Sequence, residues 1–299
     1  MSAGLKEKAF LIDASIVFFR YYYSMPDRWF SADFGFSTAA TYGFCLWLQR
    51  LLIDQQPRYV AACFDESLGT CFRNDIDPNY KCSRPLADEG LKFQLMACKT
   101  VCELMGIPAY ASNRYEADDL LGTLAAKNRQ IGRNNVIISR DKDLGQLMNQ
   151  GDALWHYPDG ERLNMQKVTA QWGVAASQIP HLLALTGDVV DDIPGVPGVG
   201  PKTAAQLLRV AGTVEQLYSD LSCVALMPIR GARKLADKLA PFETQVMRAL
   251  QLTTIDCDAP LGRRFQMRRR QMDWPSLVNY TQQLGFTLPH DLKLQKASI

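Results

Sequence analysis

The sequence predicts an α/β protein with a twisted, mostly parallel sheet flanked by helices. Three short apolar runs, at residues 9–13, 58–64 and 136–139, have the continuous hydrophobic character of strands buried on both faces. Helical patterns separate the runs, and this order is typical of parallel strands joined by right-handed crossovers. An aspartate ends or follows each run. Because parallel strands end at the same edge of a sheet, we expect these acids to lie close together.

The first two strands lead directly into Asp13 and Asp65, and the third is followed by Asp141 and Asp143. Aspartates after three separate strands are difficult to explain as solvated surface charge. If they meet at one edge of the sheet, their mutual repulsion requires a cation. The pattern therefore indicates a metal site at the carboxyl edge of the sheet.

A further group of acids, Glu116, Asp118 and Asp119, stands at the start of an apolar helical pattern over residues 117–128. The positive end of a helix offsets only about half a unit charge. A divalent metal would supply the remainder, whereas the alternative is a solvated, acid-rich first turn of a helix. Taken alone, the stretch favours the second interpretation, and only the other strand-end acids favour the first.

The remaining pattern is helical, with one irregular segment. It predicts helices at 38–53, 91–105, 166–186, 203–250 and 274–284, a short strand at 107–111 and an extended pair at 153–164. Residues 67–90 lack periodicity and mix basic with aromatic side chains, including Phe72-Arg73 and Tyr80-Lys81. Such a segment could grip a single nucleic-acid strand by charge and stacking, but composition alone favours an ordinary surface excursion.

A glycine-rich stretch follows a third group of acids near the middle of the chain. Asp188, Asp191 and Asp192 lie in a loop, and residues 195–204, Gly-Val-Pro-Gly-Val-Gly-Pro-Lys-Thr-Ala, come directly after it. The glycines open a helix at Pro201, which is a favoured first position. Exposed amides at a helix start suit a phosphate group. The spacing is not that of a nucleotide-binding P-loop, so a DNA backbone phosphate fits better.

Composition indicates a globular protein of 299 residues, with 47% hydrophobic and 21% charged residues. The net charge of +2 conceals an asymmetry: with nine acids set aside for metals, 22 acids face 33 basic residues, a balance of +11. A basic surface of this kind suits a polyanion. Cys98 and Cys102 have helical spacing and no nearby histidine, so we expect a buried helix face instead of a zinc site. Without a signal peptide or a membrane span, a cytoplasmic location is expected.

From about Leu11 to Leu284, the chain resembles the 5′-nuclease domain of bacterial DNA polymerase I and its free-standing relatives among the flap endonucleases. The resemblance rests on the order and spacing of many short motifs. They are Leu-Ile-Asp13, Tyr42-Gly-Phe44, Phe64-Asp65, Phe72-Arg73, Tyr80-Lys81, Arg84-Pro85, Glu116-Ala-Asp118-Asp119, Asp141-Lys-Asp143, Gly187-Asp188 with Asp191, and Ile193-Pro-Gly-Val-Pro-Gly-Val-Gly200 with Lys202-Thr-Ala204. Asp192 stands where asparagine is usual, which leaves open which acid of that loop is a ligand.

The resemblance implies a role for each matching residue. Asp13, Asp65, Glu116, Asp118 and Asp119 match carboxylates around a first metal, and Asp141, Asp143, Asp188 and Asp191 match those around a second. Lys81 and Arg84 match catalytic basic residues near the scissile phosphate. Arg20, Tyr42, Arg73, Tyr80, Gly198, Gly200, Lys202 and Thr203 match DNA-binding positions. The implied cofactors are two or more Mg²⁺ ions, which Mn²⁺ can replace, and a K⁺ ion at the hairpin of residues 193–204.

The same resemblance implies the organisation and the activity of the whole chain. Residues 1–185 are expected to form a metal-dependent nuclease core with a helical arch at about 67–97. Residues 186–299 are expected to form a helical duplex-DNA-binding region that contains the helix–turn–helix hairpin. The expected function is two-metal-ion hydrolysis at the 5′ ends and 5′ flaps of DNA in replication or repair, with RNA–DNA primer junctions as further substrates. A monomer associated with the nucleoid is expected.

Two alternatives from other classes remain open on the sequence. One is a structure-specific DNA-binding protein without catalysis, which the complete acidic set disfavours. The other is a ribonuclease of the related PIN type, which shares an acidic α/β edge. Such domains are about half this length and have no need of the glycine-rich stretch at 195–204.

Overall fold

The computed structural model describes residues 7–229 and 231–289, and it contains the predicted sheet. Six strands run in the order β3-β2-β1-β4-β5-β6, and all neighbouring pairs are parallel except β5 with β6 at one edge. The strands are β1 (Lys8–Asp13), β2 (Tyr59–Asp65), β3 (Ala109–Ser112), β4 (Asn134–Ile138), β5 (Ala153–Trp155) and β6 (Arg162–Leu163). The mostly parallel α/β architecture is therefore confirmed.

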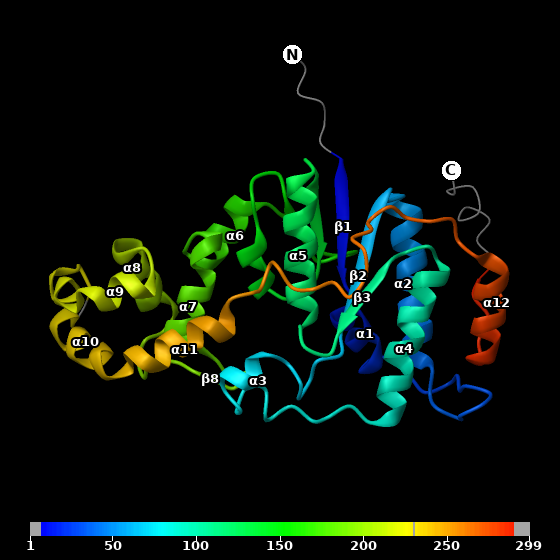
Figure 1. Ribbon diagram of the computed structural model, residues 1–299, viewed down its shortest axis with the longest axis horizontal. Helices are drawn as coiled ribbons and strands as arrows, with labels where there is room; N and C mark the ends of the chain where they lie inside the picture. Colours follow the sequence, from blue (N-terminus) through cyan, green and yellow to red (C-terminus); the bar gives the residue numbers. More distant parts are fainter. Residues whose placement is uncertain (1–6, 230, 290–299) are drawn as a thin grey trace, which may run out of the picture.

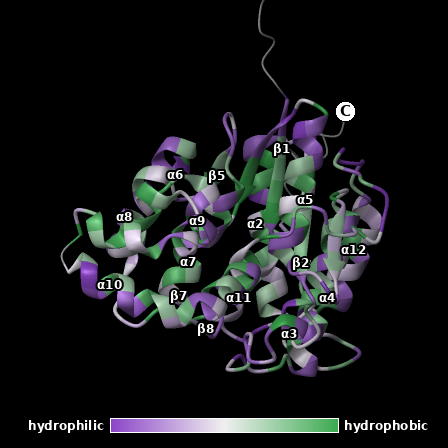
Figure 2. Ribbon diagram, turned by 60° about the vertical axis from the view of Figure 1, so that its left-hand side comes forward, coloured by the Kyte–Doolittle hydropathy of each residue, from purple (hydrophilic) through white to green (hydrophobic). Residues whose placement is uncertain are grey.

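Helices cover both faces of the sheet, and the side chains of β1 alternate between them. Phe10 and Ile12 pack in one buried cluster with side chains of α1 (Ala14–Tyr22), α2 (Ala39–Gln55), α4 (Glu89–Leu104) and α12 (Trp274–Gln283). Ala9 and Leu11 pack on the opposite face, against α5 (Ala117–Gln130). The central strands are accordingly apolar along their length (Figure 2). Cys98 and Cys102 are buried on α4, as expected.

The C-terminal helices form a second region beside the sheet (Figure 1). Before this region, the chain forms η1 (Asp143–Leu147), α6 (Met165–Trp172), η2 (Ala176–Gln178) and α7 (Ile179–Thr186). The C-terminal region itself contains β7 (Gly187–Asp188), β8 (Ile193–Pro194), α8 (Pro201–Ala211), α9 (Val214–Ser219), η3 (Leu221–Leu226), α10 (Ala232–Leu239), η4 (Ala240–Phe242) and α11 (Glu243–Thr253). The single helix predicted at 166–186 is wrong, because Gly173 adopts a left-handed conformation and ends α6.

The predicted helical arch differs from the structure over most of its length. Between β2 and α4, residues 66–88 contain one four-residue helix, α3 (Arg73–Ile76), and otherwise turns. We call residues 67–88 the strap. Pro78 and Pro85 limit helix formation there. The strap passes beneath the carboxyl ends of the strands, and α3 packs against α11 (Figure 1).

After α11 the chain returns across the molecule to the sheet and then forms α12 (Figure 1). Met267 accepts a hydrogen bond from the Val60 amide, and Arg269 donates its amide to Arg58. Residues 262–270 of this returning segment contain five arginines, and two of them, Arg263 and Arg270, form ion pairs with Glu103. Part of this arginine-rich run therefore fastens the return segment to the core. None of the helices in the described residues has both the length and the apolar character needed to cross a membrane.

Candidate metal-dependent nuclease site

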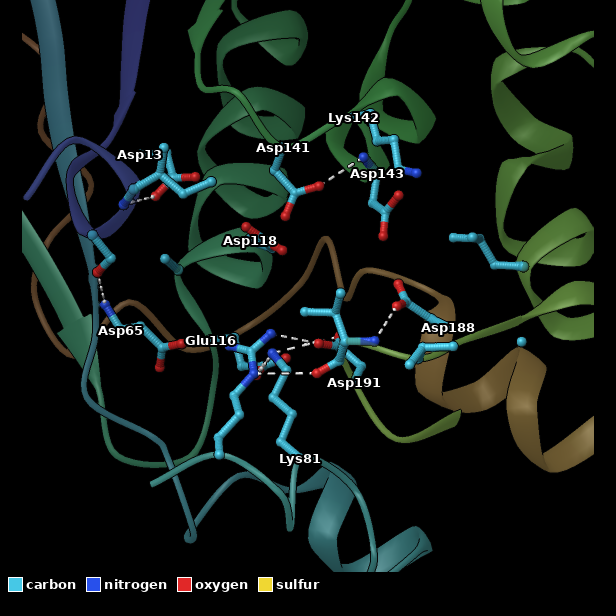
Figure 3. Close-up of a pocket in the computed structure, with 18 of the residues that line it drawn as sticks. Asp13, Asp65, Lys81, Glu116, Asp118, Asp141, Lys142, Asp143, Asp188 and Asp191 are labelled. Atoms are coloured by element: carbon cyan, nitrogen blue, oxygen red, sulfur yellow. Dashed lines mark hydrogen bonds and ion pairs between the residues drawn. The ribbon is translucent and has the colours of Figure 1, made fainter. Parts of the chain in front are cut away.

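An open pocket of about 530 Å³ lies at the carboxyl edge of the sheet, between the sheet and the C-terminal region. Its lining is dominated by acids from both parts of the chain (Figure 3). Eight carboxylates line it: Asp13, Asp65, Glu116, Asp118, Asp141, Asp143, Asp188 and Asp191. Lys81 and Arg84 line it as well. The structure thus brings together eight of the nine acids that the sequence singles out, and both predicted catalytic cations.

Strand ends position the acids nearest the sheet. Asp13 ends β1 and caps α1 by accepting a hydrogen bond from the Ile16 amide, and its other oxygen accepts one from the Ser139 hydroxyl at 2.7 Å. Asp65 ends β2 and accepts hydrogen bonds from the amide and hydroxyl of Ser67. These bonds fix the carboxylates while leaving part of each exposed to the pocket.

The start of α5 supplies two more carboxylates. Glu116 is the N-cap residue, and it forms a reciprocal capping box with Asp119. Asp118 lies one residue before Asp119 and points into the pocket (Figure 3). Since successive residues of a helix are rotated by about 100°, Asp118 and Asp119 face different surroundings.

The loop after β4 and the turn between β7 and β8 complete the acidic wall. The Asp141 amide donates to Ser139, and the Asp143 amide donates to a carboxylate oxygen of Asp141 at 2.8 Å. Asp188 ends β7 and accepts a hydrogen bond from the Val190 amide. The turn of residues 189–192 therefore presents Asp188 and Asp191 from the side opposite the sheet.

Burial and mutual repulsion make several of these acids hold protons strongly. Burial raises the pKa of Asp13 to about 7, and the nearby Asp141 and Asp65 add to the effect. Burial, together with Asp141 and Asp188, raises the pKa of Asp143 to about 8. Burial and the charges of Asp141 and Asp13 also raise the pKa of Asp118 well above its usual range. A cation in the pocket would relieve this repulsion.

Glu116 is the exception, because basic side chains surround it. Burial alone would raise its pKa, but Lys81 and Arg73 outweigh burial and lower it. Lys81 reaches Glu116 through a direct ion pair and lies 3.6 Å from Asp191. Arg84 pairs with Asp191 at 2.6 Å. Lys81 thus enters the pocket from the side opposite Asp13 (Figure 3).

The predicted role of Asp119 as a metal ligand needs correction, because the structure does not bring its side chain to the pocket. Its side chain is fully buried, and its two oxygens accept a bidentate pair from Arg73 at 2.7 Å each. They also accept the amides of Glu116 and Asp256. With its acceptor positions taken by these four groups, Asp119 is a structural carboxylate, and we remove it from the proposed metal ligands.

The predicted roles of Arg73 and Tyr80 as DNA contacts need correction for the same reason, since both side chains are buried. Arg73 is 2% exposed, and besides Asp119 it binds Glu116 and the carbonyls of Leu252 and Thr254. Tyr80 is 4% exposed, and its hydroxyl donates to Glu116 at 2.8 Å. Neither side chain is available to a passing strand. Both instead anchor the strap to the acids of the site.

The other two predicted DNA contacts of the core lie apart from the acids. Arg20 pairs with Asp159 at 3.3 Å near the molecular surface. Tyr42 is half-buried and stacks on Trp29, with a distance of 4.2 Å between ring centroids. Neither residue lines the acidic pocket, so their assignment to DNA binding stays a prediction.

The predicted hairpin is present between α7 and α8. Gly195 packs against the Thr186 carbonyl, where any side chain would overlap it, and Gly198 has a φ of +75°. Gly200 caps α8 without a side-chain hydrogen bond, and Lys202 is exposed within the first turn. Thr203 follows in the same turn. Since the first amides of a helix have no partner within it, this surface presents donors next to Pro201, which lines the acidic pocket.

The pocket acids fit hard divalent cations, since carboxylate oxygens are the ligands that Mg²⁺ prefers. Across residues 7–229 and 231–289, no three His, Cys, Asp or Glu side chains are already arranged around a single point as a closed metal cage. The acids line an open pocket instead, which suits Mg²⁺ because this ion keeps several of its waters. The raised pKa values of Asp13, Asp118 and Asp143 show that the acids lack sufficient compensating charge of their own.

Sequence reasoning missed the contacts that hold the strap in place. The Ser83 amide donates to Asp192, and the Lys81 amide donates to the Asp191 carbonyl. Lys81 and Asp192 both adopt positive φ, a conformation that non-glycine residues seldom adopt. Asp192, whose role the sequence left open, binds the strap and not the pocket. Its tolerance of the left-handed conformation was the one available signal.

Comparison with known proteins agrees with this geometry. Residues 8–173 match the family model described as 5′-3′ exonuclease, N-terminal resolvase-like domain, and residues 174–274 match 5′-3′ exonuclease, C-terminal SAM fold. A 5′-3′ exonuclease of Aquifex aeolicus is 38% identical over 211 residues, which cover 71% of this chain and 72% of the relative. DNA polymerase I of Bacillus caldotenax is 34% identical over 261 residues, 86% of this chain, and the match spans only 29% of the polymerase.

Solved structures support the fold over almost the whole chain. The T5 5′-exonuclease with bound divalent metal ions (zinc) superimposes with a TM-score of 0.66 at 19% identity, covering 97% of both chains. The catalytic core of Rad2 in complex with a DNA substrate gives a TM-score of 0.60 at 16% identity, covering 98% of this chain and 90% of that one. Because the two family models together span residues 8–274, the chain belongs to the 5′-3′ exonuclease family.

Proposed function

We propose that the protein is a metal-dependent 5′-nuclease that hydrolyses phosphodiester bonds at the 5′ ends and 5′ flaps of DNA. The observation that carries the proposal is the convergence of eight carboxylates from separate segments on one open pocket. A site for phosphoryl transfer through metal-bound water needs oxygen ligands of this kind and little other side-chain chemistry. The metals solved with the T5 5′-exonuclease support the same interpretation.

The chain's own residues bind and orient the phosphate in this proposal. When bound, the divalent metals supply charge neutralisation and an activated water. Lys81 and Arg84 hold positive charge at the pocket wall, where they can stabilise charge that develops on the phosphate oxygens. Their ion pairs with Glu116 and Asp191 keep both side chains directed into the pocket. No pocket-lining residue is a histidine or a cysteine that would serve as a nucleophile.

The hairpin of residues 193–204 would hold the duplex part of the substrate beside the pocket. Gly198, Gly200, Lys202 and Thr203 are its proposed contacts, and a K⁺ ion there is part of the proposal. Phosphate contacts carry no sequence information, so recognition should depend on the shape of the DNA. The Rad2 complex with DNA supports a DNA partner for this fold.

The proposal also includes the identity of the metal, the oligomeric state and the cellular location of the protein. We propose Mg²⁺ as the metal, with Mn²⁺ as a substitute, because both accept carboxylate oxygens. We also propose two metals at the site, a monomeric protein, action on nucleoid DNA in the cytoplasm during replication or repair, and RNA–DNA primer junctions as further substrates. The 5′-nuclease core is assigned to residues 1–185 and the duplex-binding region to residues 186–299.

Cleavage of a labelled 5′-flap duplex with and without Mg²⁺ tests the proposal. We expect products cut near the flap junction that require the metal and carry a 5′-phosphate. Asp141→Ala and Asp188→Ala should abolish cleavage while leaving binding to DNA in EDTA largely intact. Cleavage by either variant at the wild-type rate would show that the metal assignment is wrong.

Two further arms of that experiment separate the alternatives. A protein that binds flap DNA but never cleaves it would be a binding module. A protein that cleaves single-stranded RNA in preference to flap DNA would be a ribonuclease of the PIN type. The described hairpin next to the pocket favours the flap substrate, because single-stranded RNA offers no duplex for it to hold.

A further inference from the structure

A lysine from outside the hairpin lies directly over its central glycine. A methyl group built on Gly198 would come within 2.5 Å of the Lys238 Nζ. Lys238 belongs to α10, forty positions further along the chain, and is exposed. Both segments lie at the same end of the molecule (Figure 1). Because Gly198 also has a positive φ, a side chain there would be strained and would displace the lysine.

Lys238 has no ion-pair partner among the residues that the structure describes. Within the described residues, the side-chain nitrogens of Lys202, Lys234 and Lys238 form no ion pair, whereas Lys81 and Arg84 at the pocket are paired with acids. Lys234 precedes Lys238 by one helical turn, so the two point the same way from α10. Their apolar neighbours Leu235 and Leu239 are buried, which fixes the lysines on the outer side.

We propose that Lys238, supported by Lys234, is a second DNA-backbone contact that acts together with the hairpin. The inference rests on the proposed function and adds α10 to the substrate-binding surface. The occupant is a phosphate of the duplex part of the substrate. An ammonium group over Gly198, next to the free amides at the start of α8, forms a positive, donor-rich surface from two separate segments.

Several features favour duplex DNA as the occupant of this surface. The lysines and the hairpin are continuous with Pro201, which lines the acidic pocket, so a duplex on the hairpin passes close to α10. Exposed lysines bind backbone phosphates through their charge, and these contacts do not depend on the DNA sequence. An acidic protein segment would also be attracted to two lysines, but it would not need the amides of the glycine turn.

The test is binding of a labelled 5′-flap DNA duplex to the full chain in EDTA, at several salt concentrations. We expect Lys238→Met to weaken binding several-fold at moderate salt and to reduce the slope of log K against log salt by about 1. Lys238→Arg should restore both quantities. Lys127→Met is the matched control, because this substitution removes the same charge at a different place. Lys127 lies in the last turn of α5, far along that helix from Asp118.

A second variant tests the geometry. Gly198→Ala should weaken binding as well, because it displaces the Lys238 ammonium. Combining it with Lys238→Met should therefore cost less than the sum of the two effects. If Lys238→Met binds with wild-type affinity and an unchanged salt slope while the wild type cleaves flaps, α10 is not a DNA contact and the proposed function stands. If the wild type neither binds nor cleaves flap DNA, the proposed function fails and this inference fails with it.

Discussion

At the scale of single residues, the protonation of the buried acids is the property most open to measurement. Asp13 and Asp143, with pKa values of about 7 and about 8, retain protons at neutral pH in the metal-free protein. A metal that binds these carboxylates must displace the protons. We therefore expect the apparent Mg²⁺ affinity to rise between about pH 6 and pH 8. Calorimetric titrations in buffers of different ionisation enthalpy should detect the released protons.

The sign of the accompanying change in stability follows from the same pKa values. An aspartate with a raised pKa binds its proton more tightly in the folded state than in the unfolded state. The stabilising contribution of Asp13 and Asp143 in the metal-free protein should therefore be lost as the pH rises from about 4 towards 8. Saturating Mg²⁺ should weaken this loss. Proton release that stays at zero across this range would contradict the assignment of these acids as ligands.

Arg73 provides a second prediction for a single residue. It is buried between Glu116 and Asp119, and removing it leaves an uncompensated buried carboxylate. We expect Arg73→Met to destabilise the protein by about 3–5 kcal/mol, the range for breaking a buried pair. Chemical denaturation would measure the loss. Arg114→Met is the control, because its ion pair with Asp75 at 2.6 Å is exposed and should contribute little.

Replacing the partner as well tests the explanation. The double variant Arg73→Met with Asp119→Leu removes both charges and should recover part of the lost stability. If the double variant is as unstable as the sum of the single ones, the ion pair is not the cause. A cavity or the loss of the carbonyl contacts to Leu252 and Thr254 would then explain the effect.

At the scale of elements, the strap and the turn of residues 189–192 act as one unit. The turn accepts the Ser83 amide at Asp192 and the Arg84 side chain at Asp191. Asp192→Ala removes the acceptor and places alanine at a φ of +57°, whereas Asp192→Asn keeps both an acceptor and tolerance of that conformation. We expect faster amide hydrogen exchange at residues 81–84 in the alanine variant only.

A matched variant shows whether the effect is specific to the strap. Asp220→Ala removes a similar bond to the Ser222 amide in a distant loop. It should leave exchange at residues 81–84 unchanged. Equal protection of Ser83 in the wild type and in Asp192→Ala would mean that the strap is held by its other contacts, chiefly those of Lys81 and Tyr80.

The elements with a regular hydrophobic period could be predicted from the sequence, and the irregular ones could not. The strands ending at Asp13 and Asp65 and the helix at 117–128 follow from local pattern alone. The strap has no period, and its shape depends on tertiary contacts such as that of Ser83 with Asp192. Lys81 in the strap has a positive φ, and the turn beside it accepts the lysine amide, so this conformation too depends on a tertiary contact.

The same distinction explains which of the predicted metal ligands line the pocket in the structure. Eight of the nine acids reach the pocket. Asp13, Asp65, Asp141 and Asp143 do so because the carboxyl ends of parallel strands share an edge. Asp118 and Asp119 cannot be separated by sequence alone, since both begin the same helix. Only Arg73, 46 positions away, decides which of them is neutralised inside the protein. Long-range pairing of this kind leaves no local signal.

At the scale of the whole molecule, the pocket lies between two regions, and acids from both regions line it. Asp13, Asp65 and Asp118 belong to the sheet and its helices, whereas Asp188 and Asp191 belong to the turn before the C-terminal helices. Without a metal, the charge of Asp188 opposes that of Asp143 across the pocket and contributes to its raised pKa. With a metal, both acids would face a common positive charge. Metal binding should therefore strengthen the connection between the two regions.

Asp188→Asn tests this coupling in both directions, because Asp188 has no ion pair among the described residues. Without metal, the variant should be as stable as the wild type or slightly more stable, since one repelling charge is gone. With Mg²⁺ at about 100 times the dissociation constant, the wild type should gain about 2.7 kcal/mol, and the variant should gain less. Thermal unfolding with and without Mg²⁺ measures both effects, with Asp33→Asn on the exposed loop before α2 as the control. A variant that loses stability without metal and keeps the full gain with Mg²⁺ would place Asp188 outside the metal site and give it a structural role in the turn.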